Sequence, residues 1–251
     1  MQVDLTNLEN WSLKWQLPFN SSKCKVMYIG KKNPMTPYKL YNKVLDSTES
    51  EKDLGVMMDN SMKFHTHTSF AVKKANQILG LIKKSFKTRD ASTMTSLYKS
   101  FVRPYLEYGS VIWGPHFKED QKKIEGVQRR ATKIISGMHN LTYEERLEAL
   151  NLPSLAFRRD TADMHTCYKI IKGIVRIDPK EIFTFAPSRA TRGHDKRLLR
   201  TKATKLFRIN SFSQRVIKNW NRLPQDTINS SSLNIFKNKL DNLWKEKKFK
   251  F

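Results

Sequence analysis

The spacing of apolar residues changes near residue 65, and this change separates two kinds of predicted structure. Before it, short stretches such as "KCKVMYI" and "YKLYNKVL" alternate apolar and polar side chains, which is typical of β-strands with one buried face. After it, apolar residues recur every three or four positions, which is the spacing of an α-helix. The sequence therefore predicts a mainly α fold with a small antiparallel β portion at the N-terminus, an α+β class.

The N-terminal portion is predicted to be a helix packed on a small antiparallel sheet. The helix covers "VDLTNLENWSLKWQL", with Asp4 as its N-cap and Pro18 as the residue that ends it. Strands are expected over 23–29, 38–45 and 52–59. Gly55, inside the last of these, indicates a bulge or a close approach of another backbone.

Three stripes of mostly apolar side chains predict the first helices of the larger part. A fourth helix is expected over 152–173, where Pro153 suits a first turn and Gly173 suits a C-terminal cap. Two last helices are expected over 211–223 and 231–248. The three stripes consist of Phe70, Lys74, Ile78, Leu81 and Phe86; of Leu97, Phe101, Tyr105 and Tyr108; and of Ile124, Val127, Ala131, Ile134 and Ile135.

The charge of the chain points to an anionic partner. Its 251 residues contain 47 Lys and Arg against 23 Asp and Glu, a formal net charge of +24 at pH 7. Such an excess is the footprint of a nucleic-acid binder, because each neutralised phosphate releases condensed counterions. An anionic membrane surface is the competing partner, but aromatic residues interleaved with basic ones favour RNA, an RNA–DNA hybrid or DNA.

Cysteine content and hydropathy predict an intracellular protein that does not enter a membrane. Cys24 and Cys167 form neither a disulfide framework nor a zinc pattern, so a reduced compartment, nucleus or cytoplasm, is the default. No apolar run approaches the roughly 18 residues of a membrane span. The first ten residues also lack the build of a signal peptide.

The most basic stretch is "FAPSRATRGHDKRLLRTKATKLFR", which contains one acid, Asp195, and few apolar residues. We expect this stretch to be extended or mobile and to contact phosphates, which confers affinity with little sequence information. His194 could also touch phosphate, although a loop histidine is more often only exposed. The expected contacts are Arg189, Arg192, His194, Lys196, Arg197, Arg200, Lys202, Lys205 and Arg208.

Adjacent arginines occur on two of the predicted helices, in "VQRRATKII" and "AFRRDTAD". Neighbouring side chains on a helix diverge by about 100°, so only one of each pair can face a nucleic acid. A solvated surface or an ion pair with Glu125 or Asp163 is the alternative. The candidate nucleic-acid contacts on helices are Arg103, Arg129, Arg130, Arg158 and Arg159.

Aromatic residues that follow Arg103 allow two interpretations. Tyr105, Tyr108 and Trp113 could stack on bases or sugars, each contributing about 1–3 kcal/mol. A core aromatic cluster is favoured over stacking, because the helices must first pack on one another.

No catalytic or metal-binding centre is predicted. Two-metal phosphoryl transfer needs neighbouring carboxylates, yet no Asp-Asp pair occurs, and the adjacent acidic pairs lie in helical contexts typical of a solvated surface. The phosphate-binding loop, the dinucleotide turn and the H-E-x-x-H zinc motif are missing. His165 and Cys167 are two residues apart on one predicted helix, which points their side chains to different faces.

Eight motifs follow one another along nearly the whole chain. Each is weak by itself, but in this order they resemble the C-terminal part of the reverse transcriptase of non-LTR (LINE-type) retrotransposons, of the jockey and CR1 kind. The motifs are "WSLKWQLPFNSSKCKVMYIG", "SEKDLGVMMDNSMKFHTH", "LYKSFVRPYLEYGSVIWGP", "IEGVQRRATKII", "YEERLEALNLPSLAFRR", "TRGHDKRL", "FSQRVIKNWNRLP" and "FKNKLDNLW".

The resemblance implies roles for N-terminal residues and a division of the chain. Lys23 takes the place of a lysine of the family's palm. The centre of the family's primer-supporting hairpin is resembled by Asp53, Leu54, Gly55 and Val56. The implied regions are 1–62, a residual palm edge with that hairpin; 63–175, a helical thumb-like domain; and 176–251, a basic segment plus C-terminal helices.

The resemblance further implies that the family's catalytic aspartates precede the first motif and are absent from this chain. RNA-templated DNA synthesis with magnesium then belongs to the intact enzyme, and we expect no cofactor in this chain. We expect the chain to bind RNA or an RNA–DNA hybrid without polymerising alone. A stand-alone RNA-binding or architectural protein, domesticated from such an element, is the alternative.

Overall fold

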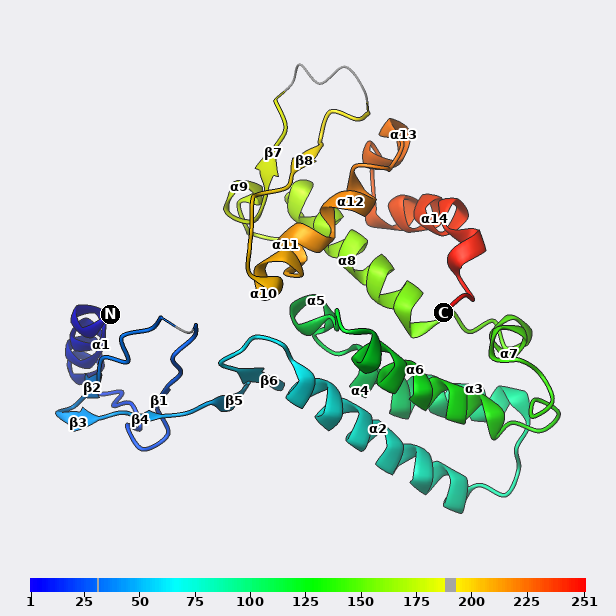
Figure 1. Cartoon of the computed structure of the whole chain (residues 1–251), viewed down its shortest axis with the longest axis horizontal. Helices are drawn as coiled ribbons and strands as arrows, with labels where there is room; N and C mark the ends of the chain where they lie inside the picture. Colours follow the sequence, from blue (N-terminus) through cyan, green and yellow to red (C-terminus); the bar gives the residue numbers. More distant parts are fainter. Residues whose placement is uncertain (31, 188–192) are drawn as a thin grey trace. The chain divides into compact units, whose positions relative to one another are not determined.

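The computed structural model describes residues 1–30, 32–187 and 193–251. They form two compact units, Met1–Thr66 and His67–Phe251. Helices predominate, and the β-structure consists of two-stranded pairs that lie mostly in the first unit (Figure 1). The predicted α+β class is confirmed.

The first unit contains one helix and three strand pairs. β2–β3 and β5–β6 are antiparallel, whereas β1 pairs with β4 in parallel, so the single antiparallel sheet expected from the sequence is wrong in part. The parallel pair is only two residues long, a length at which alternation in the sequence carries no information on strand direction. The elements are α1 (Gln2–Lys14), β1 (Lys25–Val26), β2 (Lys39–Leu40), β3 (Lys43–Val44), β4 (Asp46–Ser47), β5 (Ser50–Asp53) and β6 (Val56–Asp59).

Helix α1 is held to its unit by polar contacts more than by an apolar face. The Gln2 amide bonds the main chain of Lys39 in both directions, at 3.0 and 3.1 Å, and the main-chain N–H of Tyr41 donates to Glu9 at 2.6 Å. Ser12 is the buried residue of α1. Asp4 was expected to cap the helix, but it lies in the first turn because α1 already begins at Gln2, with Met1 as N-cap.

The β5–β6 hairpin closes through a two-residue turn. Its central residues, Leu54 and Gly55, have φ angles of +43° and +89°, as a type I′ turn requires. The bulge predicted at Gly55 is therefore wrong: the glycine supplies a turn conformation and does not lie within a strand.

The second unit is helical apart from the short β7–β8 pair and contains the five-residue π-helix Tyr98–Val102. The helices are α2 (His65–Ser85, which begins at the unit boundary), α3 (Ala91–Leu97), α4 (Arg103–Glu107), α5 (Ser110–Trp113), α6 (Lys118–Lys133), α7 (Tyr143–Ala149), α8 (Leu155–Ile171), α9 (Pro179–Ile182), α10 (Leu206–Ile209), α11 (Phe212–Arg215), α12 (Ile217–Trp220), α13 (Gln225–Ile228) and α14 (Leu233–Leu243), with strands β7 (Thr184–Phe185) and β8 (Leu198–Leu199).

Two of the three predicted apolar stripes lie outside the core, with their residues half-buried or exposed. Helix α2 buries Ala71, Ala75, Leu79 and Ile82, and α3–α4 buries Met94, Tyr98, Val102 and Leu106. Both segments carry a second set of apolar residues at helical spacing, one position away from the buried set. Burial against neighbouring helices decides between them, and the π-helix shifts the buried face by lengthening one turn. The third stripe is correct for Ile124, Val127, Ala131 and Ile135.

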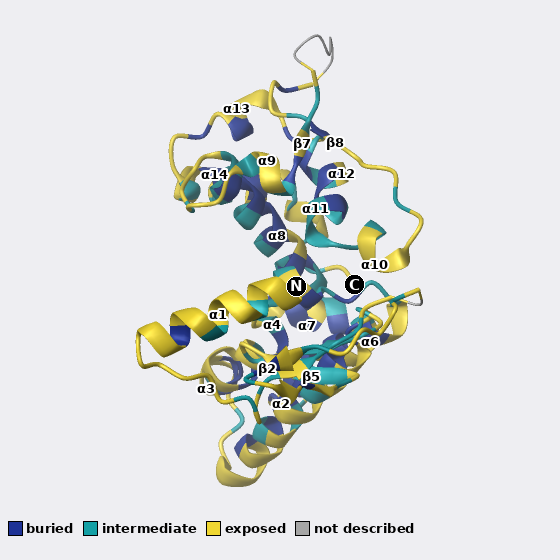
Figure 2. Ribbon diagram, turned by 90° about the vertical axis from the view of Figure 1, so that its left-hand side faces the viewer, coloured by how far each residue is buried: buried dark blue, intermediate teal, exposed yellow. Residues whose placement is uncertain are grey.

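Helix α8 runs through the second unit, and buried residues gather along it (Figure 2). Its N-cap is Ser154, whose hydroxyl accepts from the main-chain N–H of Phe157 at 3.1 Å, and Gly173 follows its C-terminus with a φ of +66°. Beyond its midpoint, α8 packs into an aromatic core in which Tyr168 stacks on Phe236 at 4.3 Å between ring centroids and Trp220 is fully buried. Residues after β8, among them Val216, Ile217 and Trp220, belong to this core, which anchors that part of the chain to α8.

Candidate nucleic-acid interface

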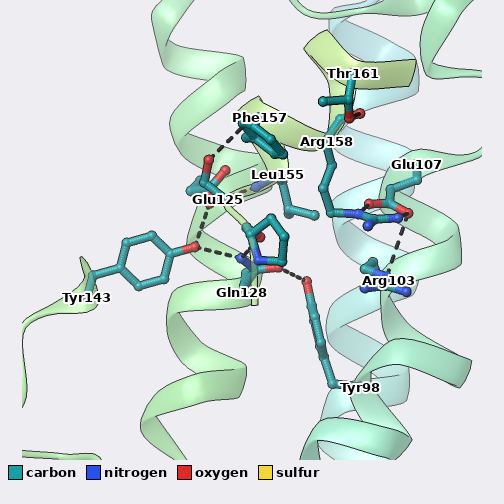
Figure 3. Close-up of polar contacts among 12 residues, drawn as sticks. Tyr98, Arg103, Glu107, Glu125, Gln128, Tyr143, Leu155, Phe157, Arg158 and Thr161 are labelled. Atoms are coloured by element: carbon teal, nitrogen blue, oxygen red, sulfur yellow. Dashed lines mark hydrogen bonds and ion pairs between the residues drawn. The ribbon is translucent and has the colours of Figure 1, made fainter. Parts of the chain in front are cut away.

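A buried chain of hydrogen bonds joins α6 to the helices around it (Figure 3). The Tyr98 hydroxyl donates to Gln128 at 2.6 Å, and the Gln128 amide donates to the Tyr143 hydroxyl at 3.1 Å. Glu125 accepts from Tyr143 at 2.5 Å and from the main-chain N–H of Leu155 at 3.1 Å. Burial raises the pKa of Glu125, and the hydrogen bond from Tyr143 opposes that rise. These groups bind one another and fix the start of α8.

Two of the predicted nucleic-acid contacts share one carboxylate beside this network (Figure 3). Arg158 donates to both oxygens of Glu107, with 2.9 Å between Nη2 and Oε2, and Arg103 Nε lies 3.6 Å from Oε2. Ion pairing was the alternative considered for Arg158, but its partner is Glu107. Burial and the neighbouring charge of Arg158 lower the pKa of Arg103.

Three further helical candidates have different surroundings. Arg129 and Arg130 are both exposed: the Arg129 guanidinium lies 4.3 Å from the Tyr143 ring centre, and Arg130 donates to the Asn76 amide oxygen at 3.0 Å. Arg159 is only 9 % exposed and turns inward. The structure thus brings exposed arginines to α6, whereas α8 presents buried or paired ones.

The predicted basic stretch is described over 185–187 and 193–208, and residues 194–208 are called the basic segment below. Arg189 and Arg192 lie outside the described residues. The exposed cations of the basic segment have no side-chain hydrogen bond or ion pair with any described residue, whereas Arg197 is half-buried and interacts locally. The exposed set is Lys196, Arg200, Lys202, Lys205 and Arg208.

Polar side chains of the C-terminal helices hold the main chain of the basic segment. Trp220 Nε1 donates to the carbonyl of Lys196 at 2.8 Å, and the Asn221 amide bonds both the N–H and the carbonyl of Leu198, at 2.9 and 2.8 Å. Strand β8 also pairs with β7. The main chain is therefore held at Lys196 and Leu198, while the exposed cations of the basic segment remain in solvent, an arrangement suited to phosphate contacts.

The anchors Trp220 and Asn221 were not predicted as site residues. The sequence holds only one signal for them, an Asn that follows a Trp at the end of a helix rich in apolar residues.

His194 serves the fold of the basic segment, and the expectation of an exposed loop histidine is wrong. The side chain is 4 % exposed; Nε2–H donates to the Trp220 carbonyl at 3.0 Å and Nδ1 accepts from the N–H of Lys196 at 3.2 Å. Both nitrogens are occupied in the neutral form, and burial lowers the pKa of His194. The ring lies at a site lined by Trp220, where a charged imidazolium would lose hydration.

The aromatic candidates divide between core and surface. Trp113 is buried and donates to the carbonyl of Tyr108 at 2.7 Å, as a core cluster requires. Tyr105 and Tyr108 are exposed, together with Phe101. The surface of α4 and the preceding π-helix therefore carries aromatic rings that the core interpretation did not expect.

The N-terminal candidates lie in the first unit. Lys23 is exposed in a turn after α1. Asp53 and Leu54 are exposed at the tip of the β5–β6 hairpin, whereas Val56 is buried. The hairpin exists as expected, and its support of a primer stays a prediction.

Within residues 1–30, 32–187 and 193–251, no group of three or more His, Cys, Asp or Glu side chains is arranged to hold a metal ion. None of the helices in this described part combines the length and apolar character needed to cross a membrane.

Comparison with known proteins finds similarity to transposon polymerases. The chain is 26% identical over 142 residues to the Drosophila melanogaster protein named "Probable RNA-directed DNA polymerase from transposon BS" (54% of this chain, 16% of that protein). It is 26% identical over 145 residues to the RNA-directed DNA polymerase from mobile element jockey of Drosophila funebris (55% and 15%). An uncharacterised Caenorhabditis elegans protein is 23% identical over 124 residues (48% and 63%).

These similarities have a limited extent. The match spans about one sixth of the length of the two polymerases. No family model matches the chain, and no solved structure matches it. Over about half of its length, the chain resembles RNA-directed DNA polymerases of non-LTR transposons.

Proposed function

We propose that the chain is a fragment of an RNA-directed DNA polymerase of a non-LTR transposon and binds RNA or an RNA–DNA hybrid through phosphates. The observation that carries this proposal is the basic segment, whose main chain is held at Lys196 and Leu198 by Trp220 and Asn221 while five cations are exposed to solvent. The similarity to transposon polymerases and the net charge of +24 support it.

The mode of binding follows from the chemistry of this surface. Each phosphate neutralised by a lysine or arginine releases counterions, so affinity falls steeply with salt. The exposed cations of the basic segment make no ion pair with any described residue, so none has to be broken when they bind phosphate. Exposed Arg129 and Arg130 on α6 add to the positive surface. Such contacts distinguish sequences weakly.

The chain is proposed not to extend a primer by itself. Phosphoryl transfer of this type needs carboxylates that hold two divalent ions, and this chain has no Asp-Asp pair. Magnesium would act in the intact enzyme. Primer extension by the purified chain with dNTPs and magnesium would disprove this part of the proposal.

Binding is tested with the purified chain and single-stranded RNA, an RNA–DNA hybrid and double-stranded DNA across a salt series. The variant replaces Lys196, Arg200, Lys202 and Lys205 with Gln. Four lost phosphate contacts should lower the log–log salt slope for single-stranded RNA by up to about 3. The matched control makes the same charge change at Lys73, Lys74, Lys84 and Lys87, exposed residues in and just after α2.

The result expected is a flatter slope for the variant of the basic segment and a smaller change for the control. Equal slopes for both would show that net charge alone drives binding. Absence of binding at low salt would overturn the proposal.

A further inference from the structure

A cavity of about 350 Å³ opens in the second unit, beside the first half of α8. Its volume lies at the lower end of the roughly 300–1,000 Å³ typical of small-molecule sites. Helices α5, α6, α8 and α11 each contribute to its lining. The lining side chains on which the argument rests are His116, Arg159, Asp160, Asp163 and Arg215.

One wall of the cavity is a closed ion pair. Arg215 donates to both oxygens of Asp163, at 2.7 and 2.8 Å, and also to the carbonyls of Val111, at 2.6 Å, and Asn210, at 3.2 Å. Each nitrogen of this guanidinium therefore has a protein partner. The ion pair is therefore neutral and already fully hydrogen-bonded. A ligand in the cavity would have to be bound by the other lining side chains.

Arg159 supplies a donor without a partner. It is 9 % exposed, and its Nη1 has no hydrogen bond with any described residue. A buried guanidinium N–H that stays unpaired is costly. Nη1 is itself covered, so a small turn of the Arg159 side chain, which lines the cavity, would bring it to an acceptor that enters there. Its neighbour Asp160 also lines the cavity, and the Asp160 carboxylate makes no hydrogen bond or ion pair within the described part of the chain.

The charge of the lining disfavours a phosphate group. Two aspartates accompany two arginines, so the cavity offers no excess of positive charge. A neutral ligand with acceptors on one edge and donors on the next would satisfy Arg159 and Asp160 together. His116 adds an aromatic ring to the same lining, and rings of this type stack on nucleobases.

We infer that this cavity binds an unstacked nucleobase of single-stranded RNA and prefers guanine. Guanine presents O6 and N7 as acceptors for arginine and N1–H and N2–H as donors for a carboxylate. That Watson–Crick edge is accessible only in a nucleotide without a base-pairing partner. The inference deepens the proposed function and depends on it: the basic segment supplies affinity through phosphates, and the cavity supplies a preference for one base.

The test measures fluorescence anisotropy of labelled RNA octamers with the full chain. The octamers are uridine throughout, or carry one central guanosine, adenosine, cytidine or inosine. Guanosine should bind about tenfold more tightly than adenosine, in the range of one well-made base contact. Inosine, which lacks the N2 amine, should lose most of that advantage.

The matched variants are Asp160→Asn and Asp241→Asn. Both positions are exposed, so neither substitution disturbs the core. Asp160→Asn should reduce the guanosine preference at least fivefold and leave the binding of the uridine octamer unchanged, whereas Asp241→Asn should change neither. Arg159→Gln should act in the same direction where the variant folds.

The outcomes separate the two proposals. Equal affinity for all octamers with a steep salt slope would overturn the guanine site and leave phosphate binding intact. A guanosine preference that survives Asp160→Asn would overturn the assigned carboxylate contact. Absence of binding to every octamer at low salt would overturn the proposed function itself.

Discussion

The first half of α8 and the basic segment both carry several basic side chains, yet the surroundings of these side chains differ. Around α8, two arginines are ion-paired: Arg158 binds Glu107, and Arg215 binds Asp163. In the basic segment, Trp220 and Asn221 bond the main chain, and the five exposed cations make no side-chain hydrogen bond or ion pair with any described residue. A count of basic residues does not reveal this difference, which depends on where the acids lie.

The two regions should therefore respond differently to mutation. Removing one member of a buried ion pair leaves an uncompensated charge and is strongly destabilising. Removing an exposed cation changes stability little but removes a phosphate contact. Stability and salt dependence are thus independent measurements, and each reports on one region.

The largest effect is expected from Asp163→Ala. This change strands the charge of Arg215 in a half-buried site, and we expect the free energy of unfolding to fall by about 3–5 kcal/mol. Urea denaturation measures it, with Asp241→Ala as the exposed control, expected within about 0.5 kcal/mol of the parent. A loss below 1 kcal/mol for Asp163→Ala would mean that the pair is already broken in solution.

A smaller loss is expected from Asn221→Ala, which tests the anchoring of the basic segment. The N–H and carbonyl of Leu198 both lose their partner, and unsatisfied groups of this kind cost about 1–3 kcal/mol. Asn219→Ala, two residues away, is the matched control. Equal denaturation midpoints for the two variants would show that β7–β8 pairing alone holds the segment.

His165 provides a test by pH at the other face of α8. Burial and nearby cations lower the pKa of His165 to about 4, so the folded protein holds the neutral ring. Because the unfolded chain binds a proton at His165 more readily than the folded protein does, His165 favours unfolding once the pH falls below 6.5. The free energy of unfolding therefore falls progressively between pH 6.5 and about 4 and is unaffected by His165 above this range. His165→Gln removes the dependence, so the stability of the parent should fall by about 1–2 kcal/mol more than that of the variant between pH 7 and pH 5. If the free energy of unfolding changed with pH in the same way for the parent and for His165→Gln, the lowered pKa of His165 would be contradicted.

Apolar spacing predicted the α+β class and the positions of most helices, but not which face each helix buries. Leu81 was expected in the core, but Ile82 is there instead. Both residues belong to apolar sets at helical spacing, and the packing of neighbouring helices determines which set is buried. Five of the predicted cations of the basic segment are exposed, whereas Arg197 is half-buried. Its anchor Trp220 reaches Lys196 across 24 residues of sequence, a contact that no local pattern encodes.

The smallest effect on stability, and the sharpest contrast with Asp163→Ala, is expected from Arg200→Gln. Arg200 is exposed in the basic segment and makes no ion pair with any described residue, so the free energy of unfolding should change by less than about 0.5 kcal/mol. The log–log salt slope for RNA should nevertheless fall by about 1, because one phosphate contact is lost. Arg200→Lys is the control, since a lysine keeps the charge and should keep the slope. If Arg200→Gln left the slope unchanged while Arg130→Gln lowered it, the phosphate surface would lie on α6, and the contrast between the two regions would have to be redrawn there.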